Sequence, residues 1–335
     1  MLFCTKGRYR LAFAVLVALF FAGCDDAPHD NPLDPLSPKY ENRGSLLVRA
    51  QSFYPPRSPL ANVTLFLAPG NYLLTTNTEG TAVFSDLAPQ PYVLVASKNG
   101  YVGDTVEVEV RAHQTAQYAF QLNAIPQITN VAIYSERISR WFPVNLDSYN
   151  LVVTAHVQDA DGAQDLTRVQ LLSKTHGALQ DMTFRPEIGR FELIIKEADL
   201  PGKSIFDFIG ESLQIAAHDR EAALTLSEPF ALARVIEATP IAESPAGLHR
   251  TSVRPRFAWH STTVPYTYSF RIDISQFEPE QQFATLFESV GDIHPDSTTY
   301  LTSHDLPGGT YYWTVSIVDR YGNISRSKEA TFEVR

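Results

Sequence analysis

The stretch LPGGTYYWTVSIVDRYGN, which runs from Leu306 to Asn323, contains the pattern that decides the fold. Trp313, Val315 and Ile317 recur at every second position, which is the spacing of a strand that turns one face toward a core. A Leu-Pro-Gly turn precedes this strand and an Asp-Arg-Tyr-Gly-Asn segment follows it, and these residue types favour turns. The stretch therefore predicts one strand of a sheet between two turns.

The same alternation recurs along the chain. In ANVTLFLA, Val63, Leu65 and Leu67 share one face, and YNLVVTAHV from Tyr149 to Val157 repeats the pattern. The 15 Tyr and 20 Phe residues, with abundant Val and Thr, favour strands, and long runs of Ala, Leu, Glu and Lys at helical spacing are missing. We therefore predict an all-β chain with three tandem β-sandwich domains.

The first predicted domain comprises residues 44–123. This domain contains a spaced series of apolar, aromatic, Thr and Gly residues, namely Asn62 to Leu67, Thr78, Gly80, Phe84, Leu87, Tyr92, Leu94, Gly100 and Tyr101. This series resembles the carboxypeptidase regulatory-like, transthyretin-type sandwich, in which spaced Thr, Gly, Phe, Leu and Tyr residues precede a Gly-Tyr pair. The resemblance implies a β-sandwich without catalytic activity.

The second predicted domain comprises residues 126–233. In YNLVVTAHVQDADGAQDLTRVQLLS a strand ends in an acidic turn, and a second strand with Leu166, Val169 and Leu171 begins behind it. This order resembles bacterial immunoglobulin-like domains. The resemblance implies a second sandwich.

The third predicted domain comprises residues 236–335. RPRFAWHS carries Phe257 and Trp259, and LPGGTYY places Tyr311 five residues after Leu306. These features resemble a fibronectin type III sandwich, in which the two aromatic residues lie in the core and the corner Tyr hydroxyl bonds back to the turn. The segment from 276 to 294 is longer than a standard loop of that family, and PEQQFATLFESV within it predicts a short helix.

The front end of the chain predicts export. Lys6, Arg8 and Arg10 precede an apolar run over residues 11–22, which is the layout of a signal peptide over residues 1–23. Twelve apolar residues at about 1.5 Å each do not cross a hydrocarbon core of about 30 Å. The sequence Phe21-Ala22-Gly23-Cys24 resembles a bacterial lipobox, which implies that Cys24 is linked to diacylglycerol and becomes the first residue after cleavage. The alternative is ordinary signal cleavage near a free thiol.

The lipid expected on Cys24 predicts the cellular location of the protein. Residues 24–43, which begin with the lipidated cysteine and are rich in proline, read as a flexible tether. We expect a lipid-anchored protein of the bacterial cell envelope, with the membrane as a partner through the anchor. The outer membrane is favoured over the inner membrane, although Asp25 and Asp26 follow the cysteine, and in enterobacteria an Asp at the first of these positions is associated with inner-membrane retention.

The charge of the chain argues against one class of partner. The formal net charge is −10, and loss of the three basic residues of the signal peptide leaves 24 basic and 37 acidic residues, a net charge of −13. Nucleic-acid binding depends on clustered Lys and Arg side chains at phosphates, so no nucleic-acid partner is expected.

The segment DADGAQD holds the one candidate metal site of the sequence. Carboxylates at Asp159, Asp161 and Asp165 around a Gly resemble a calcium loop, because hard cations take several oxygen ligands around a tight turn. An EF-hand also requires a Glu at the twelfth position, where this chain has Gln170. The alternative is an Asp-Gly turn that joins two strands.

Other chemistry has little support in the sequence. The nine histidines form no HxH or HExxH pattern, and we find no Gly-x-Ser-x-Gly elbow and no Gly-rich phosphate loop. We therefore expect no enzyme and no cofactor other than calcium at the acidic turn. Several aromatic residues are candidates for stacking on a sugar or a partner side chain if they are exposed, namely Tyr54, Trp141, Phe142, Tyr266 and Tyr268.

These observations predict a non-catalytic envelope protein that displays β-sandwich modules to a protein or glycan partner. Two alternatives remain open. The first is a scaffold or accessory subunit of an envelope assembly, which predicts an apolar patch at a groove between domains or on the 276–294 segment. The second is a carbohydrate-active hydrolase, which requires acids or a His pair that converge in a cleft.

Overall fold

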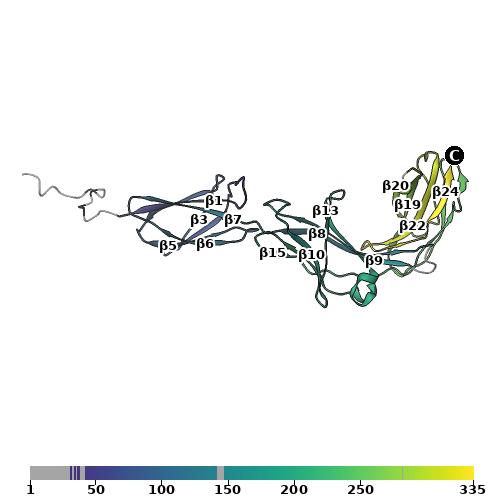
Figure 1. The fold of residues 1–335 in the computed structure, drawn as a ribbon, viewed down its shortest axis with the longest axis horizontal. Helices are drawn as coiled ribbons and strands as arrows, with labels where there is room; N and C mark the ends of the chain where they lie inside the picture. Colours follow the sequence, from purple (N-terminus) through teal and green to yellow (C-terminus); the bar gives the residue numbers. More distant parts are fainter. Residues whose placement is uncertain (1–30, 32–33, 35, 38–41, 142–146, 281) are drawn as a thin grey trace, which may run out of the picture. The chain divides into compact units, whose positions relative to one another are not determined.

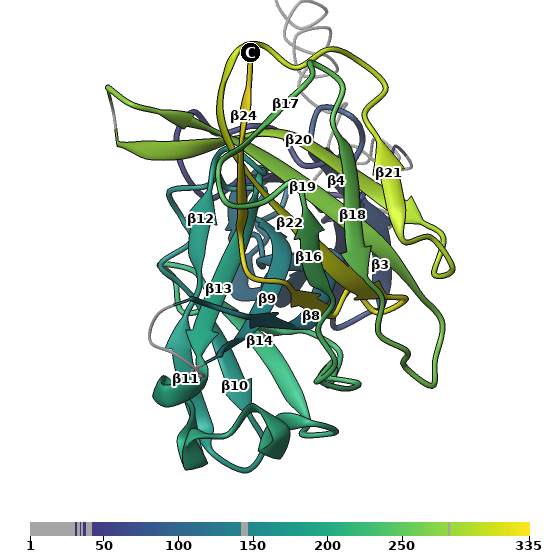
Figure 2. The ribbon, with the colours of Figure 1, turned by 90° about the vertical axis from the view of Figure 1, so that its right-hand side faces the viewer.

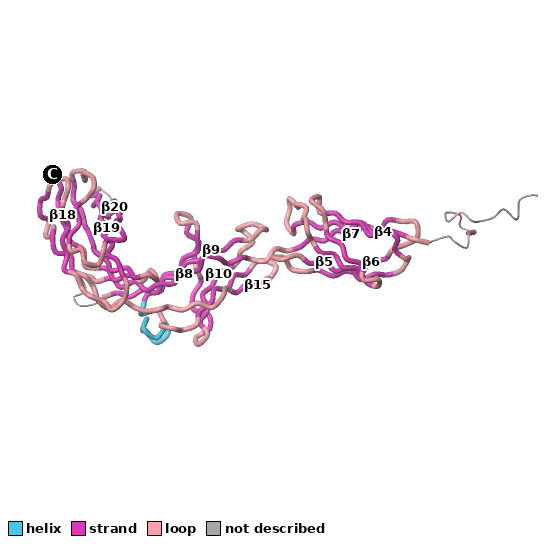
Figure 3. Tube along the Cα trace, turned by 180° about the vertical axis from the view of Figure 1, so that it is seen from behind, coloured by secondary structure: helices cyan, strands magenta, loops and turns pink. Residues whose placement is uncertain are grey.

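The computed structural model of the protein describes residues 31, 34, 36–37, 42–141, 147–280 and 282–335. Strands and loops make up nearly all of this part of the chain, as Figures 1 and 3 show, so the predicted all-β class is confirmed. The described residues contain no helix with the length and apolar character needed to span a membrane. The predicted signal peptide and Cys24 lie outside the described residues.

The chain divides into two compact units. The N-terminal unit comprises the described residues up to Gln51 together with Pro56–Lys98 and Gly103–Leu122. The C-terminal unit comprises Ser52–Pro55, Asn99–Val102 and Asn123–Arg335.

The N-terminal unit consists of two sheets. Their strand orders are β4-β1-β7 and β3-β2-β5-β6. The strands are β1 (Gly44–Ser52), β2 (Thr64–Ala68), β3 (Tyr72–Thr75), β4 (Thr81–Leu87), β5 (Pro91–Ser97), β6 (Asp104–Glu109) and β7 (Thr115–Leu122). Alternate residues are buried, and Val63, Leu65 and Leu67 are fully inaccessible to solvent, as the alternation in the sequence predicts. At one corner the Tyr92 hydroxyl donates to the Ala88 carbonyl at 3.1 Å.

The first half of the C-terminal unit surrounds one hydrophobic core. Its strands are β8 (Gln127–Ile138), β9 (Ser148–Gln158), β10 (Arg168–Ser173), β11 (Gly177–Asp181), β12 (Thr183–Arg185), β13 (Arg190–Lys196), β14 (Leu213–His218) and β15 (Leu224–Leu226). Three short 3-10 turns, η1 (Glu197–Asp199), η2 (Pro201–Lys203) and η3 (Ile205–Phe208), follow β13 and bring Ile205 and Phe208 into the core. Sheet β11-β10-β14-β15 covers one side of this core.

The second half surrounds a separate core. Its strands are β16 (Ile241–Ser244), β17 (His249–Thr251), β18 (Arg256–His260), β19 (Tyr268–Glu278), β20 (Phe283–Ile293), β21 (Thr299–Leu301), β22 (Gly309–Asp319), β23 (Ile324–Arg326) and β24 (Ala330–Val334). Sheet β16-β18-β21 packs against β19 and β22 (Figure 2). Between them, the ring centres of Phe257 and Trp313 lie 4.8 Å apart. Phe257 and Trp259 are buried, as the sequence predicts. The predicted corner is also confirmed, because the Tyr311 hydroxyl donates to the Pro307 carbonyl at 2.9 Å.

One sheet joins the two halves. Its strand order is β12-β13-β9-β8-β23-β22-β19-β20, and β8 pairs with β23 in parallel through Ile324 with Glu136 and Arg326 with Ile138. Asn323, which is 1 % exposed, supports this junction by accepting hydrogen bonds from the backbone N–H and the hydroxyl of Ser135 at 2.8 and 3.1 Å. Residues 126–233 and 236–335 therefore have separate cores but share a sheet within one compact unit.

The short helix predicted in PEQQFATLFESV is wrong. Residues from Phe283 onward form β20, which pairs antiparallel with β19 from Phe270 with Ile293 to Glu278 with Phe283. The hydrogen bonds of an eight-pair ladder and the β-preferring Phe, Thr and Val residues outweigh the weak helical spacing of the segment. The 276–294 segment is thus a long hairpin that extends the sheet by one edge strand.

Candidate functional site

The loop between β9 and β10 brings the three predicted carboxylates together. Asp159, Asp161 and Asp165 each offer an oxygen, and these atoms all lie within 4.8 Å of one another. The loop is closed by a bond from the Asp161 N–H to Asp159 Oδ1 at 2.8 Å and by one from the Asp165 N–H to the Gly162 carbonyl at 3.0 Å. Gly162 has φ +113°, where a side chain is strained, so this turn depends on glycine.

Neighbouring loops of the same unit close over this cluster. The Ala124 N–H donates to Asp161 Oδ2 at 2.6 Å, and the Tyr54 hydroxyl donates to Asp165 Oδ1 at 3.0 Å. Asp219, from the loop between β14 and β15, accepts from Asn123 Nδ2 at 2.7 Å. The acidic cluster is therefore built from one loop and is covered by residues that are distant from this loop in sequence. The spacing of residues in the sequence does not predict these contacts.

The electrostatics of the cluster are unfavourable without a bound cation. Burial raises the pKa of Asp159, the backbone hydrogen bond from Asp161 opposes this, and the charges of Asp165, Asp161 and Asp219 raise it further. Like charges about 5 Å apart repel by roughly 3 kcal/mol at an effective dielectric constant of about 20. The described residues include no Lys or Arg side chain in an ion pair with these carboxylates.

The predicted aromatic residues have different environments. Trp141 is 64 % exposed, whereas Tyr54 is bonded to the acidic cluster. Tyr266 is covered by the guanidinium of Arg234 at 4.1 Å, and Tyr268 donates to the Thr262 carbonyl at 3.3 Å. Phe142 lies outside the described residues. Trp141 is therefore the most exposed ring among the described candidates, and the Lys328 ammonium lies 4.7 Å from the centre of this ring.

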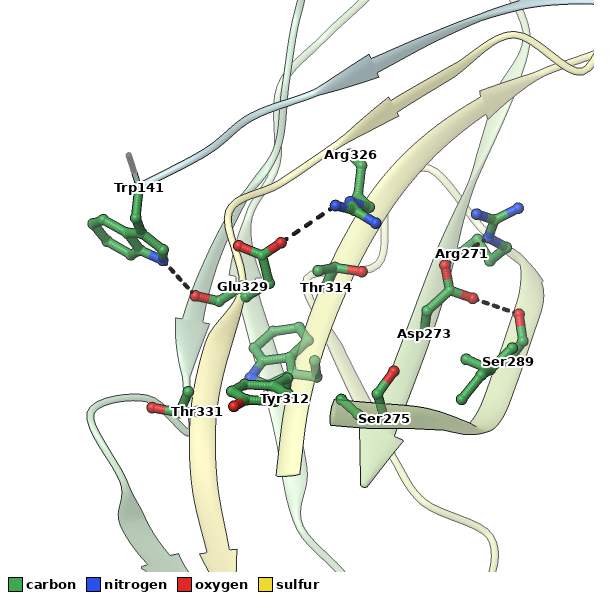
Figure 4. A pocket seen from close by; sticks show the side chains of 13 residues that line it. Trp141, Arg271, Asp273, Ser275, Ser289, Tyr312, Thr314, Arg326, Glu329 and Thr331 are labelled. Atoms are coloured by element: carbon green, nitrogen blue, oxygen red, sulfur yellow. Dashed lines mark hydrogen bonds and ion pairs between the residues drawn. The ribbon is translucent and has the colours of Figure 1, made fainter. Parts of the chain in front are cut away.

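A groove lies beside Trp141 on the solvent face of the sheet that carries β19, β20 and β22. Its volume is about 800 Å³, and Figure 4 shows the polar side chains that surround it. They are Arg271, Asp273 and Ser275 from β19, Ser289 from β20, Tyr312 and Thr314 from β22, and Arg326, Glu329 and Thr331 near the C-terminus. Trp141 also borders a second cavity of about 460 Å³.

Hydrogen bonds hold the groove side chains in place. Trp141 Nε1 donates to the Glu329 carbonyl at 2.7 Å, and the Glu329 carboxylate lies 3.3 Å from the Arg326 guanidinium (Figure 4). Asp273 is held by Arg271 at 3.0 Å and by the Ser289 hydroxyl at 2.6 Å. The two acids and two arginines balance in charge, so the groove suits a polar ligand without a large net charge.

The sequence did not reveal this groove. The alternation of Arg271, Asp273 and Ser275 with buried neighbours predicts a solvent-facing strand face but not what lies beside it. The groove needs side chains from β19, β20, β22, the β23–β24 region and the segment after β8, and strand pairing brings these together. The groove residues that the structure describes include no histidine.

No protein-family model matches the chain, and no curated protein is detectably similar to it. Solved structures with weak similarity include the major pilin subunit BcpA of Bacillus cereus, at 11 % identity and a TM-score of 0.31 over 84 % of this chain and 91 % of that one. The FN1–FN3 domains of chicken CNTN1 match at 13 % identity and a TM-score of 0.30, over 81 % and 91 % of the two chains. Fibronectin(III)-like modules of Clostridium thermocellum CbhA match at 12 % and 0.28, over 63 % and 93 %.

Proposed function

We propose that this chain is a non-catalytic, lipid-anchored protein of the bacterial cell envelope, with the outer membrane favoured, and that it binds a glycan in the groove beside Trp141. Its β-sandwich modules display this groove, and the anchor at Cys24 holds the protein at the membrane. The observation that carries the binding proposal is the exposed side chain of Trp141 next to a groove lined with polar side chains.

The groove has the features that a sugar ligand needs. An aromatic ring offers an apolar face for the C–H groups of a pyranose, and fixed polar groups beside it select the hydroxyls. The ring of Trp141 is held in place by its bond to Glu329, which reduces the entropy lost on binding. Arg271 and Arg326 also line the groove, and a guanidinium group supplies hydrogen-bond donors for ligand hydroxyls.

A second candidate function is that of a scaffold or accessory subunit. Strand β20 is an edge strand of 11 residues on which Phe283, Leu286 and Phe287 are exposed. Exposed apolar side chains on a long edge strand favour association with another polypeptide. These exposed apolar side chains on the 276–294 segment support the scaffold alternative.

The glycan proposal is tested with the Trp141→Ala variant. Binding of soluble bacterial polysaccharide fragments to the wild-type protein and to the variant is measured by calorimetry, because the variant lacks the exposed indole and Trp313 also lines the groove. We expect the wild-type protein to bind at least one fragment and the variant to bind it about tenfold more weakly, which corresponds to about 1.4 kcal/mol.

The control is Phe184→Ala, which removes another exposed ring far along the chain from Trp141 and leaves the groove intact. Equal affinity of the Trp141→Ala variant and the wild type for every bound fragment contradicts the proposal. Capture of a protein partner that depends on Phe283 instead supports the scaffold function.

A further inference from the structure

Buried oxygen atoms without hydrogen-bond partners gather at the acidic loop of the C-terminal unit. Among the described residues, eight buried side-chain polar atoms have no partner, and three of them are Asp159 Oδ2, Asp165 Oδ2 and Asn123 Oδ1. Asp165 is 1 % exposed and Asn123 is 6 % exposed. Buried polar atoms are nearly always paired, so three acceptors without donors in one region point to a missing positive partner.

Asp159, Asp165 and Asn123 each make a hydrogen bond through one polar atom of the side chain, and a second polar atom of the same side chain has no partner. Asp165 Oδ1 accepts from Tyr54, and Asp159 Oδ1 accepts from the backbone of Asp161, which leaves the Oδ2 atoms of both residues free. Asn123 directs its Nδ2 to Asp219, which leaves its carbonyl oxygen free. Hydrogen bonds therefore orient the acidic side chains and leave a set of oxygen acceptors without donors.

We propose that Asp159, Asp161 and Asp165 bind a calcium ion, and that Asp219 and Asn123 complete the negative, oxygen-rich surroundings of the site. The three carboxylates already have oxygens within 4.8 Å of one another, a separation that one cation bound between them at 2.3–2.6 Å can span. The ion supplies the positive charge that no described Lys or Arg provides.

The ligand types favour calcium over other divalent ions. Carboxylate and amide oxygens suit a hard cation, and the cluster contains neither Cys nor His, which zinc prefers. Calcium accepts irregular sets of six to eight oxygens, whereas magnesium requires a near-ideal octahedron at shorter distances. A loop whose carboxylates are spaced unevenly and held by different neighbours therefore fits calcium better.

The experiment uses the purified full-length chain after chelator treatment. Calcium is titrated by calorimetry, and unfolding is followed with and without calcium, with magnesium as the comparison ion. At a calcium concentration ten times Kd we expect the Tm of the C-terminal unit to rise by about 3–6 °C. Terbium provides a second readout, because Tyr54 lies against Asp165 and sensitises the luminescence of a bound lanthanide.

The test variant is Asp159→Asn, which can keep the hydrogen bond that closes the loop but removes one charge. We expect calcium to bind at least about tenfold more weakly, and we expect the calcium-free variant to be more stable than the calcium-free wild type because one repulsive charge is gone. A residue that only forms the turn gives neither effect.

The matched control is Asp292→Asn, an exposed aspartate at φ +55°, a conformation that Asn also adopts. It should leave the response to calcium unchanged. No binding heat and no Tm shift at millimolar calcium in the wild-type protein overturn the proposal. An equal response to magnesium overturns the assignment of the ion.

Discussion

Asp147 and Asp181 each accept a hydrogen bond from an arginine, but the two ion pairs differ in their exposure to solvent. The side chains of Arg137 and Asp147 are 18 % and 21 % exposed, and Ser139 donates to the same carboxylate at 3.0 Å. The side chains of Arg168 and Asp181 are 52 % and 56 % exposed. We expect Asp147→Asn to lower the free energy of unfolding by about 1–2 kcal/mol, and Asp181→Asn by no more than about 0.5 kcal/mol.

The difference in the free energy of unfolding between the wild type and Asp147→Asn should depend on pH. Burial raises the pKa of Asp147, but the hydrogen bonds from Arg137 and Ser139 and the charge of Arg137 outweigh it, so the pKa lies below its usual value. The stabilisation is present above the unfolded pKa of about 3.9 and is lost as the pH falls through the folded pKa. Urea unfolding between about pH 6 and pH 2 should show the gap between wild type and Asp147→Asn closing in acid. A gap that stays constant contradicts this assignment.

Contacts between residues close in sequence can be predicted from the sequence, whereas contacts between distant residues cannot. The corner bond of Tyr311 and the turn formed by Asp159 and Asp161 are local, so a few adjacent residues are enough to predict them. The contact between Trp141 and Glu329 joins residues 188 positions apart, and no local pattern encodes it. The sequence therefore indicates Trp141 as a candidate aromatic residue but not the groove beside it.

For two elements, strand pairing determines a structure that the spacing of apolar residues in the sequence does not. The segment that becomes β20 has apolar residues at both helical and strand spacing, and its pairing with β19 gives it strand structure. The parallel pairing of β8 with β23 was equally invisible, because the two strands belong to different predicted domains. Local propensity is a weak prior for such elements, and tertiary pairing overrides it.

The junction between β8 and the β22–β23 turn depends on Asn323. Its side chain accepts from Ser135 and donates to Asp319 Oδ2 at 3.0 Å in a buried setting. Asn323→Ala leaves the Ser135 N–H and one oxygen of Asp319 with fewer partners, and we expect a loss of about 2–4 kcal/mol. Because the two cores are joined by this sheet, urea unfolding of the variant should also separate into two transitions.

Gln180→Ala is the control for that experiment, because it removes an exposed amide from edge strand β11. Surface substitutions of this kind change stability by about 0.5 kcal/mol or less. If Asn323→Ala unfolds like the control in one unchanged transition, the buried hydrogen bonds at the junction do not couple the two cores.

At the scale of the whole molecule, the cores of the described units contain no cysteine, and both cysteines of the chain lie outside the described residues. Each core has enough buried aromatic and aliphatic side chains to fold without a covalent crosslink. A formal charge of −10 gives the chain no electrostatic attraction to an anionic lipid surface. We therefore propose that the lipid predicted on Cys24 provides the attachment to a membrane.

We expect Cys24→Ser to move the protein from the membrane pellet to the soluble fraction, because two or three acyl chains hold a protein far more firmly than one chain or a charged surface. Cys4→Ser is the matched control, since Cys4 lies in the predicted signal peptide, and it should leave the protein in the pellet. Mass spectrometry of the wild-type N-terminus should find a lipid-modified cysteine, and the denatured mature protein should not react with a maleimide. A Cys24→Ser protein that stays in the pellet after a high-salt wash shows that another feature of the chain provides the anchor.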